Sequence, residues 1–169
     1  MKVLIFDTET TGLLPKYYFK TNNNTIIDFM RDFPYIVQLS FILFDTEKLV
    51  IIESHDFIIK VPDEVEISEK SYSIHGIDKK KSSEEGVDIK ECLITLRNVY
   101  KKADIIVAHN VEYDLPVIQI EGSRNNMGVI MNKNDNGKQF YCNMKNTVNL
   151  CNIIKTNSRG TYKKYPSQE

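Results

Sequence analysis

Near its N-terminus the chain reads Val3-Leu4-Ile5-Phe6-Asp7-Thr8-Glu9-Thr10-Thr11-Gly12. The apolar run before Asp7 predicts a buried strand. Side chains alternate between the two faces of a strand, so Asp7 and Glu9 project from the same face, roughly 6–7 Å apart. Two converging carboxylates repel each other unless a cation lies between them, and their hard oxygen atoms suit Mg²⁺ or Mn²⁺. The stretch predicts a metal site; the alternative is a solvated strand end without metal.

A second informative stretch covers residues 103–115. A short apolar strand, 105–108, leads into a helix that begins near Glu112 and carries Asp114 in its first turn. A carboxylate there can point back over the strand ends, where open α/β sheets bind ligands. The alternative is that Asp114 only complements the helix dipole. Asn110 is expected to cap this helix first and to face a substrate second, and His109 is either a hydrogen-bonded structural residue or a ligand.

These stretches resemble motifs of the DEDD superfamily of 3′–5′ exonucleases, which includes polymerase proofreading domains, ribonuclease T and the mammalian three-prime repair exonucleases. Asp7 to Gly12 match the superfamily's first motif in full. The run Ala108-His109-Asn110 followed by Tyr113-Asp114 resembles the second motif, with Tyr113 in place of a common Phe. Ser73 to Ile77 resembles an Ile-His-Gly-Ile segment that lies beside the terminal nucleotide in many members.

The resemblance implies an α/β, ribonuclease-H-like mixed sheet, with a three-strand antiparallel meander plus parallel strands, flanked by helices. It also implies a two-metal site for Mg²⁺ or Mn²⁺, in which Asp7 bridges both ions, Glu9 holds the first and Asp114 the second. The residues implied to contact the terminal nucleotide are Thr10, Thr11, Leu13, His75 and Asn110. The implied reaction is 3′–5′ exonucleolysis at single-stranded or frayed ends of DNA or RNA, releasing nucleoside monophosphates.

The superfamily's third motif, a late helix with a His and an Asp, has no counterpart in the sequence. His occurs only at 55, 75 and 109, and the last Asp is Asp135. We therefore expect one exonuclease-like domain, 1–169, that is incomplete at the C-terminus, with the C-terminal helices missing and an apolar sheet surface open to a protein partner. The competing hypothesis is a catalytically impaired, exonuclease-derived module that binds nucleic acid or protein; an unrelated nucleotide-binding domain is a more remote third.

Bulk composition limits the class of protein. The chain has 169 residues, 41% hydrophobic and 27% charged, which fits one globular domain. A net charge of −1 gives no overall basic field for nucleic acid. The run Lys79-Lys80-Lys81 is either a solvated loop or a contact to substrate phosphates.

The sequence also bears on compartment and source. Three cysteines without metal-type spacing, and no leader ahead of the first strand, predict reduced thiols in an intracellular protein, cytoplasmic or nuclear. No apolar stretch approaches the ~20 residues that span a bilayer. Abundant Lys, Ile and Asn suggest an AT-rich genome of viral, phage or protist origin.

Local patterns predict the remaining elements. We expect a loop insertion over 15–33 with a helical turn near 26–30, strands within 36–44 and 49–61, and a polar connection around 73–77. A capping box, Ser82 with Glu85, predicts an amphipathic helix over 84–102. An exposed loop over 122–138, a strand at 141–144 and a helical segment at 147–153 follow, and the Lys/Tyr-rich residues from Thr156 form a polar end without assigned structure.

Overall fold

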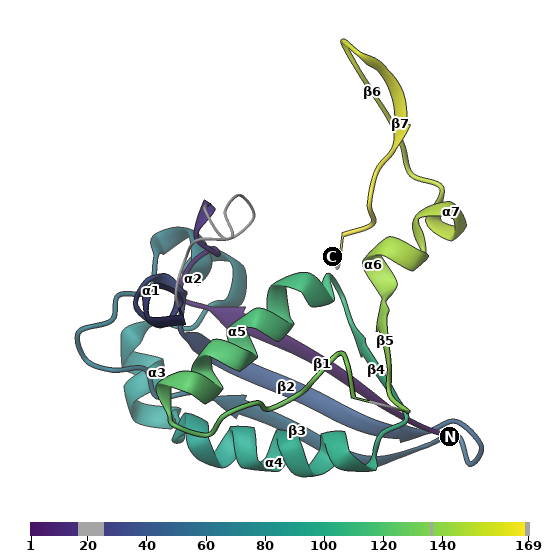
Figure 1. The fold of residues 1–169 in the computed structure, drawn as a ribbon. Coiled ribbons are helices and arrows are strands. Elements are labelled where there is room, and N and C mark those ends of the chain that lie inside the picture. The colour runs from purple at the N-terminus through teal and green to yellow at the C-terminus, as the bar shows by residue number, and fades with distance from the viewer. Residues whose placement is uncertain (17–25, 136, 168–169) are drawn as a thin grey trace.

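A five-stranded mixed sheet forms the centre of the computed structural model, which describes residues 1–16, 26–135 and 137–167 (Figure 1). The strand order is β3-β2-β1-β4-β5. β1–β2 and β2–β3 pair antiparallel, and β1–β4 and β4–β5 pair parallel. The predicted meander plus parallel strands is therefore confirmed. The bounds are β1 Lys2–Thr10, β2 Ile36–Asp45, β3 Val50–Ile58, β4 Ile105–Ala108 and β5 Gln139–Cys142.

The two longest helices, α4 (Ile89–Lys102) and α5 (Val111–Arg124), cover one face of the sheet (Figure 1). Shorter helices lie around the sheet or follow β5: α1 Ile26–Asp32, α2 Glu69–His75, α3 Lys79–Glu85, α6 Asn143–Asn146 and α7 Val148–Cys151. None of the helices in the described ranges is long and apolar enough to cross a membrane. Residues 17–25 of the predicted 15–33 insertion lie outside the described residues; the helical turn predicted near 26–30 is α1.

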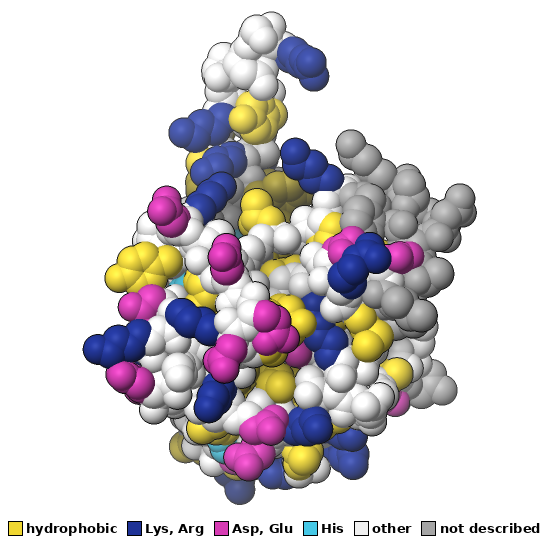
Figure 2. Space-filling view, turned by 90° about the vertical axis from the view of Figure 1, so that its left-hand side faces the viewer, with side chains coloured by type: hydrophobic (Ala, Val, Ile, Leu, Met, Phe, Trp, Pro, Cys, Tyr) yellow, Lys and Arg dark blue, Asp and Glu magenta, His cyan; other side chains and the backbone are white. Residues whose placement is uncertain are grey.

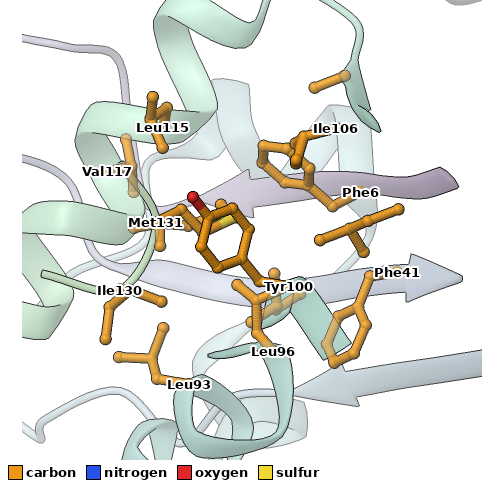
Figure 3. Close-up of a cluster of buried hydrophobic side chains, with 14 of the residues drawn as sticks. Phe6, Phe41, Leu93, Leu96, Tyr100, Ile106, Leu115, Val117, Ile130 and Met131 are labelled. Carbon is orange, nitrogen blue, oxygen red and sulfur yellow. The ribbon is translucent and has the colours of Figure 1, made fainter. Parts of the chain in front are cut away.

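The hydrophobic core lies between helices α4 and α5 and the face of the central sheet that they cover (Figure 3). Phe6 of β1 and Phe41 of β2 point from alternating strand positions toward Leu93 and Leu96 of α4, and all four are at most 2% exposed. A period of two on the strands and of three to four on the helix puts these side chains on facing surfaces. Burying a side chain of this size contributes about 1.5–3 kcal/mol to stability.

The opposite face of the sheet is partly open to solvent. Ile5 of β1 is 40% exposed, and its neighbours on that face are Ile42 of β2 and Val107 of β4. Asp7 and Glu9 follow Ile5 at two-residue steps, so both carboxylates lie on this face too. They lie inside β1, which runs to Thr10 rather than ending near Asp7 as predicted, because residues 7–10 pair with β2.

Residues 79–102 form two helices rather than the single predicted one. The predicted capping box at Ser82 is wrong, because Ser82 lies inside α3, where its hydroxyl accepts from Val61 N–H at 3.0 Å and donates to Ile59 carbonyl at 2.8 Å. The actual N-caps are Asp78 and Asp88. The break falls at Val87, whose N–H donates to Ile58 and whose carbonyl accepts from Lys60, so the chain here extends beside β3.

Gly86 makes this break possible. A Cβ at Gly86 would lie 2.1 Å from the Ser82 carbonyl oxygen and 2.5 Å from the Lys60 nitrogen. We expect Gly86→Ala to lower the free energy of unfolding by about 1–3 kcal/mol, because backbone atoms cannot move aside cheaply. Urea unfolding would measure the loss. Gly12→Ala is the matched control, since nothing lies within 4 Å of a Cβ there, and an equal loss in both variants would contradict the argument.

The chain after β5 leaves the sheet and ends in a hairpin that the sequence did not predict. After α6 and α7, strands β6 (Ile154–Asn157) and β7 (Gly160–Lys163) pair antiparallel as a separate two-stranded sheet. Figure 1 shows this hairpin projecting away from the central sheet. All eight of its strand residues are exposed, so no alternation of apolar and polar residues marked these strands.

Candidate active site

The two acidic motifs meet in one pocket with a volume of about 220 Å³. β1 and β4 are parallel neighbours, so the polar residues of β1 and the residues that follow β4 reach the same end of the sheet. The lining residues are Asp7, Thr8, Glu9, His109, Asn110, Tyr113 and Asp114. The structure thus brings together the three carboxylates singled out in the sequence.

Asp114 is the most buried of these carboxylates, with 3% of its surface exposed. Its Oδ1 accepts hydrogen bonds from the Thr8 hydroxyl at 2.6 Å and the Thr8 N–H at 3.2 Å. Burial, and less strongly the Asp7 charge, together raise the pKa of Asp114 from 3.8 to about 7 against the opposing hydrogen bonds from Thr8. Asp114 is therefore more than a partner for the helix dipole, because it packs against β1 and interacts with Asp7.

The pKa of Glu9 is also raised, by less than that of Asp114. Burial is the main cause, and the charge of Asp7 adds to it. Asp7 therefore acts on both other carboxylates, and the pocket concentrates negative charge at a partly desolvated place.

The donor set fits a hard divalent cation. Carboxylate oxygens are what Mg²⁺ and Mn²⁺ prefer, and a cation would offset the repulsion that raises the pKa values of Glu9 and Asp114. Within the described residues no three or more Asp, Glu, His or Cys side chains form a closed ligand group. Asp7, Glu9 and Asp114 line the same pocket without forming such a group.

Tyr113 joins the two motifs. Its hydroxyl donates to the Gly12 carbonyl at 2.8 Å and lies 2.7 Å from the Thr10 hydroxyl, which also lies 2.7 Å from that carbonyl. Burial raises the pKa of Tyr113, so the phenol stays protonated and can donate. The Phe that is common at this position in the superfamily could not make these bonds. The turn after Glu9 is thereby fixed to the first turn of α5.

The other predicted substrate residues lie beside the pocket rather than in its lining. Thr11 accepts from the Tyr35 N–H at 3.0 Å through its hydroxyl. His75 accepts from the Ile77 N–H at Nδ1, so its Nε2 at 3.3 Å from the Thr10 carbonyl is the protonated nitrogen of a neutral ring. Burial lowers the pKa of His75, which favours that neutral form. Leu13 is 74% exposed.

Asn110 does line the pocket, but the prediction that its side chain caps α5 is wrong. Asn110 has the left-handed φ of 57° and makes no side-chain capping bond. Asn is one of the few residues that adopt this conformation readily. Its amide is therefore available to the pocket rather than used by the helix.

Thr8 is a functional residue that was not predicted. The prediction covered the alternate positions Asp7 and Glu9, whereas Thr8 faces the other side of β1, toward α5. The sequence did contain a signal for this role: Thr8 is a hydroxyl-bearing residue between two acidic residues, and the helix expected to pack nearby carries Asp114 in its first turn.

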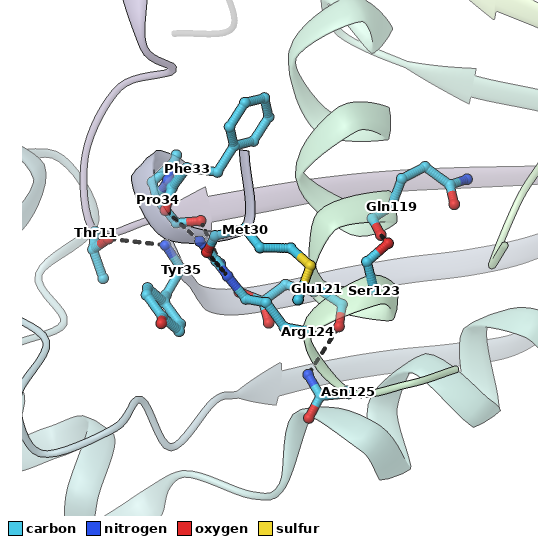
Figure 4. A network of polar contacts seen from close by, with 10 residues as sticks. All are labelled: Thr11, Met30, Phe33, Pro34, Tyr35, Gln119, Glu121, Ser123, Arg124 and Asn125. Atoms are coloured by element: carbon cyan, nitrogen blue, oxygen red, sulfur yellow. Dashed lines mark hydrogen bonds and ion pairs between the residues drawn. The ribbon is translucent and has the colours of Figure 1, made fainter. Parts of the chain in front are cut away.

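A buried polar network holds the far end of α5 (Figure 4). The Arg124 guanidinium pairs with Glu121 at 2.7 Å and donates to the carbonyls of Met30, Phe33 and Pro34. It also lies 3.8 Å from the centre of the Tyr35 ring. Tyr35 exchanges hydrogen bonds with Thr11, so this network supports the turn that follows Glu9.

Among solved structures, exonuclease I has a fold similar to that of this chain. Escherichia coli exonuclease I with a 5cy-dA13 oligonucleotide matches with a TM-score of 0.71 at 15% identity, covering 98% of this chain and 34% of that one. A product-bound exonuclease I gives 0.69 at 17% identity, covering 94% and 35%. The E. coli enzyme with dT13 gives 0.68 at 16% identity, covering 94% and 32%. This chain spans about a third of the length of those chains, and the likeness concerns the fold.

The sequence itself was also compared with protein families and with curated proteins. No curated protein matches the chain significantly. The RNase_T family model, described as exonuclease, matches residues 4–152, which include both acidic motifs and the central sheet apart from the first two residues of β1. The chain therefore belongs to the RNase_T exonuclease family, within the DEDD superfamily, and has its ribonuclease-H-like fold.

Proposed function

We propose that this nuclease-family chain is a metal-dependent 3′–5′ exonuclease acting on single-stranded or frayed ends of DNA or RNA and releasing nucleoside monophosphates. The observation that carries the proposal is the shared pocket of Asp7, Glu9 and Asp114, in which Asp7 raises the pKa of both other carboxylates. Such a site gains most from a divalent cation. Asp114 is 3% exposed, so it is not a solvated carboxylate at a helix start.

The pocket residues divide into ligands, supports and substrate contacts. Asp7, Glu9 and Asp114 would hold Mg²⁺ or Mn²⁺, which when bound supplies an activated water and stabilises charge on the scissile phosphate. Thr8 holds Asp114 in position, and the Asn110 amide can donate to a phosphate oxygen.

The turn beside the pocket would hold the terminal nucleotide. Leu13 projects into solvent and can contact a base or sugar, while His75 and the Thr10–Thr11 turn form the wall beside it. Because the hydroxyls of Thr10 and Thr11 already bond within the protein, these residues would shape the site rather than bind through their side chains.

Two structural neighbours favour single-stranded DNA as the first substrate to test. They are exonuclease I complexes with the oligonucleotides dA13 and dT13. Another is described as an ExoI/SSB-Ct complex, which supports testing for a protein partner as well. The half-exposed sheet face around Ile5 is the place we propose for such a partner.

A second function, binding of nucleic acid with weak or no cleavage, is favoured by the number of acidic residues. The DEDD pattern has four, and Asp7, Glu9 and Asp114 supply three. The sequence has no Asp after Asp135 to act as the fourth and no His after His109 to act as the base. His109 lines the pocket and is the nearest candidate to accept a proton. If no other group supplies the missing ligand and base, the chain would bind nucleic acid and cleave it slowly, since a general base contributes about 10²–10⁴-fold to a rate.

The test is a 20-nucleotide single strand labelled at its 5′ end, incubated with the purified chain and Mn²⁺. We expect a ladder that shortens from the 3′ end, and a rate about 10²-fold lower for Asp7→Asn, because removing even an indirect support of a metal ligand costs 10–100-fold. Asp63→Asn, at an exposed loop position, is the control. Equal rates for all three proteins would contradict the proposal, and binding without cleavage would support the second function.

A further inference from the structure

The segment from α6 to the end of β7 and the residues after it, 143–165, is the basic arm of this protein. It contains Lys145, Lys155, Arg159, Lys163 and Lys164 and no Asp or Glu. The whole chain has a net charge of −1, so the arm carries +5 and all other residues together carry −6. The weak overall charge therefore hides a strong separation of charge.

The cations of the hairpin are exposed and not neutralised by carboxylates. Among the residues that the structure describes, no ion pair involves Lys155, Arg159, Lys163 or Lys164. Lys163 donates a hydrogen bond to the neutral Asn149 side chain at 3.0 Å. Figure 2 shows dark-blue side chains along the projecting arm, above a body where both signs of charge mix. Two tyrosines accompany them, Tyr162 at 49% and Tyr165 at 53% exposure.

The base of the arm lies beside the acidic pocket. Cys142, the residue before the arm, pairs with Ala108 in the sheet, so the arm leaves the sheet next to His109. Lys145 bonds Glu112 at 2.6 Å, two residues before Asp114. The pKa of Lys145 is raised mainly by that bond and also by Tyr165, so the chain after β7 returns to the same place. Figure 1 shows this return toward the start of α5.

A nuclease built on this pocket needs attraction from elsewhere, because the pocket itself repels phosphate. Asp7, Glu9 and Asp114 favour a cation and oppose a polyanion until metal is bound. Exposed cations interleaved with aromatic rings are what single-strand binding surfaces use, the cations for phosphates and the rings for stacking bases. An acidic protein would pair with the cations but would leave the tyrosines without flat partners.

We propose that the basic arm binds the substrate strand upstream of its 3′ end, through phosphate contacts of Lys155, Arg159, Lys163 and Lys164 and base stacking on Tyr162 and Tyr165. This inference rests on the proposed function for the pocket but concerns a different surface. It assigns to the hairpin the holding of the strand and leaves the cleavage to the carboxylates.

The experiment measures binding of fluorescent dT20 by anisotropy in EDTA, where no cleavage occurs. The test variant replaces Lys155, Arg159, Lys163 and Lys164 with Gln. The control removes the same charge from exposed lysines on the body: Lys48, Lys60, Lys90 and Lys101. We expect the arm variant to bind about tenfold more weakly at 50 mM salt and to flatten the log–log salt slope by about 2–3, since each phosphate contact on a single strand contributes about 0.7. The control should stay within about twofold.

Two further measurements define the partner. Tyr162→Ala should weaken dT20 binding about fivefold while leaving the salt slope unchanged, because stacking a base on an aromatic ring contributes to affinity but releases no counterions. A trinucleotide, too short to reach from the pocket to the hairpin, should bind all variants equally weakly in EDTA, because the metal-free pocket repels phosphate. Circular dichroism should show all variants folded, since the hairpin residues lie outside the core.

Three results would overturn the proposal: no binding of dT20 by the unaltered chain in EDTA, equal loss in the arm and control variants, or binding of polyglutamate as tight as that of dT20. The last would identify an acidic protein as the partner. Because these assays omit metal, they stay independent of the cleavage assay. Loss of the ladder without loss of arm-dependent binding would refute the nuclease activity alone.

Discussion

Replacing Arg124 with Met is expected to lower the free energy of unfolding by about 3–5 kcal/mol, the usual cost of removing one partner of a buried ion pair. Arg124 and Glu121 have side-chain exposures of 8% and 3%. Burial raises the pKa of Glu121, and the charge and hydrogen bond of Arg124, together with a backbone hydrogen bond from Ile36, oppose that shift. Without Arg124 the carboxylate must either stay charged in a dry place or take up a proton.

The loss would extend beyond the ion pair. The guanidinium also donates to the carbonyl of Met30 in α1 and to those of Phe33 and Pro34, which lie between α1 and β2. Each buried acceptor left without a donor costs about 1–3 kcal/mol. Since Tyr35 in this segment bonds to Thr11, we expect the turn beside the acidic pocket to loosen as well.

Urea unfolding at pH 7 would measure the effect, with Arg97→Met as the control. Arg97 also donates to backbone carbonyls, of Met127 and Val129, but has no carboxylate partner among the described residues. Its loss should cost less than about 1.5 kcal/mol. Adding Glu121→Gln to Arg124→Met should recover part of the stability, because the buried charge is then gone. A single-variant loss below about 1 kcal/mol would show that the pair is not buried in solution.

The central sheet was predictable because its pattern is local. Leu39, Phe41 and Leu43 alternate along β2, and the apolar stripe of α4 repeats every three to four residues. The three carboxylates followed from strand alternation and from the position of Asp114 in the first helical turn. These features depend on neighbours within a few residues, which a single sequence displays.

The features that escaped prediction have either no apolar pattern or distant partners. α2 has no buried residue, and every strand residue of β6 and β7 is exposed, so neither shows a periodicity. Thr8 and Asp114 are 106 positions apart, and Arg124 reaches carbonyls more than 90 positions away. Such contacts depend on how whole elements pack, which local spacing does not specify.

Asp114→Asn is expected to stabilise the metal-free protein at pH 8 by up to about 4 kcal/mol. The pKa of Asp114 is raised to about 7 in the fold, from 3.8, and each unit corresponds to 1.36 kcal/mol. Because the folded carboxyl holds its proton more tightly, its contribution is fully favourable below pH 3.8 and is lost as pH rises through 7. Asn has no charge to bury, and its oxygen can still accept from Thr8.

Mn²⁺ should reduce this difference in stability between the unaltered chain and Asp114→Asn. A cation in the pocket favours ionised carboxylates, so it should raise the melting temperature of the unaltered chain at pH 8 more than at pH 5.5, where Asp114 is protonated. At a concentration 100 times the Kd, binding to the folded state alone adds about 2.7 kcal/mol. Asp114→Asn should gain much less, since it keeps Asp7 and Glu9 but lacks the third carboxylate.

Thermal melts of both proteins at pH 5.5 and 8, each in EDTA and in Mn²⁺, would test these expectations together. Asp63→Asn serves as the control for removing a carboxylate that lies in solvent. Equal stability of the unaltered chain and Asp114→Asn at pH 8 in EDTA would contradict the raised pKa. Equal Mn²⁺ shifts in both would remove Asp114 from the ligand set. If Asp114→Asn raises the stability in EDTA but reduces the gain in stability from Mn²⁺, then Asp114 lowers the stability of the metal-free fold and contributes by binding the cation.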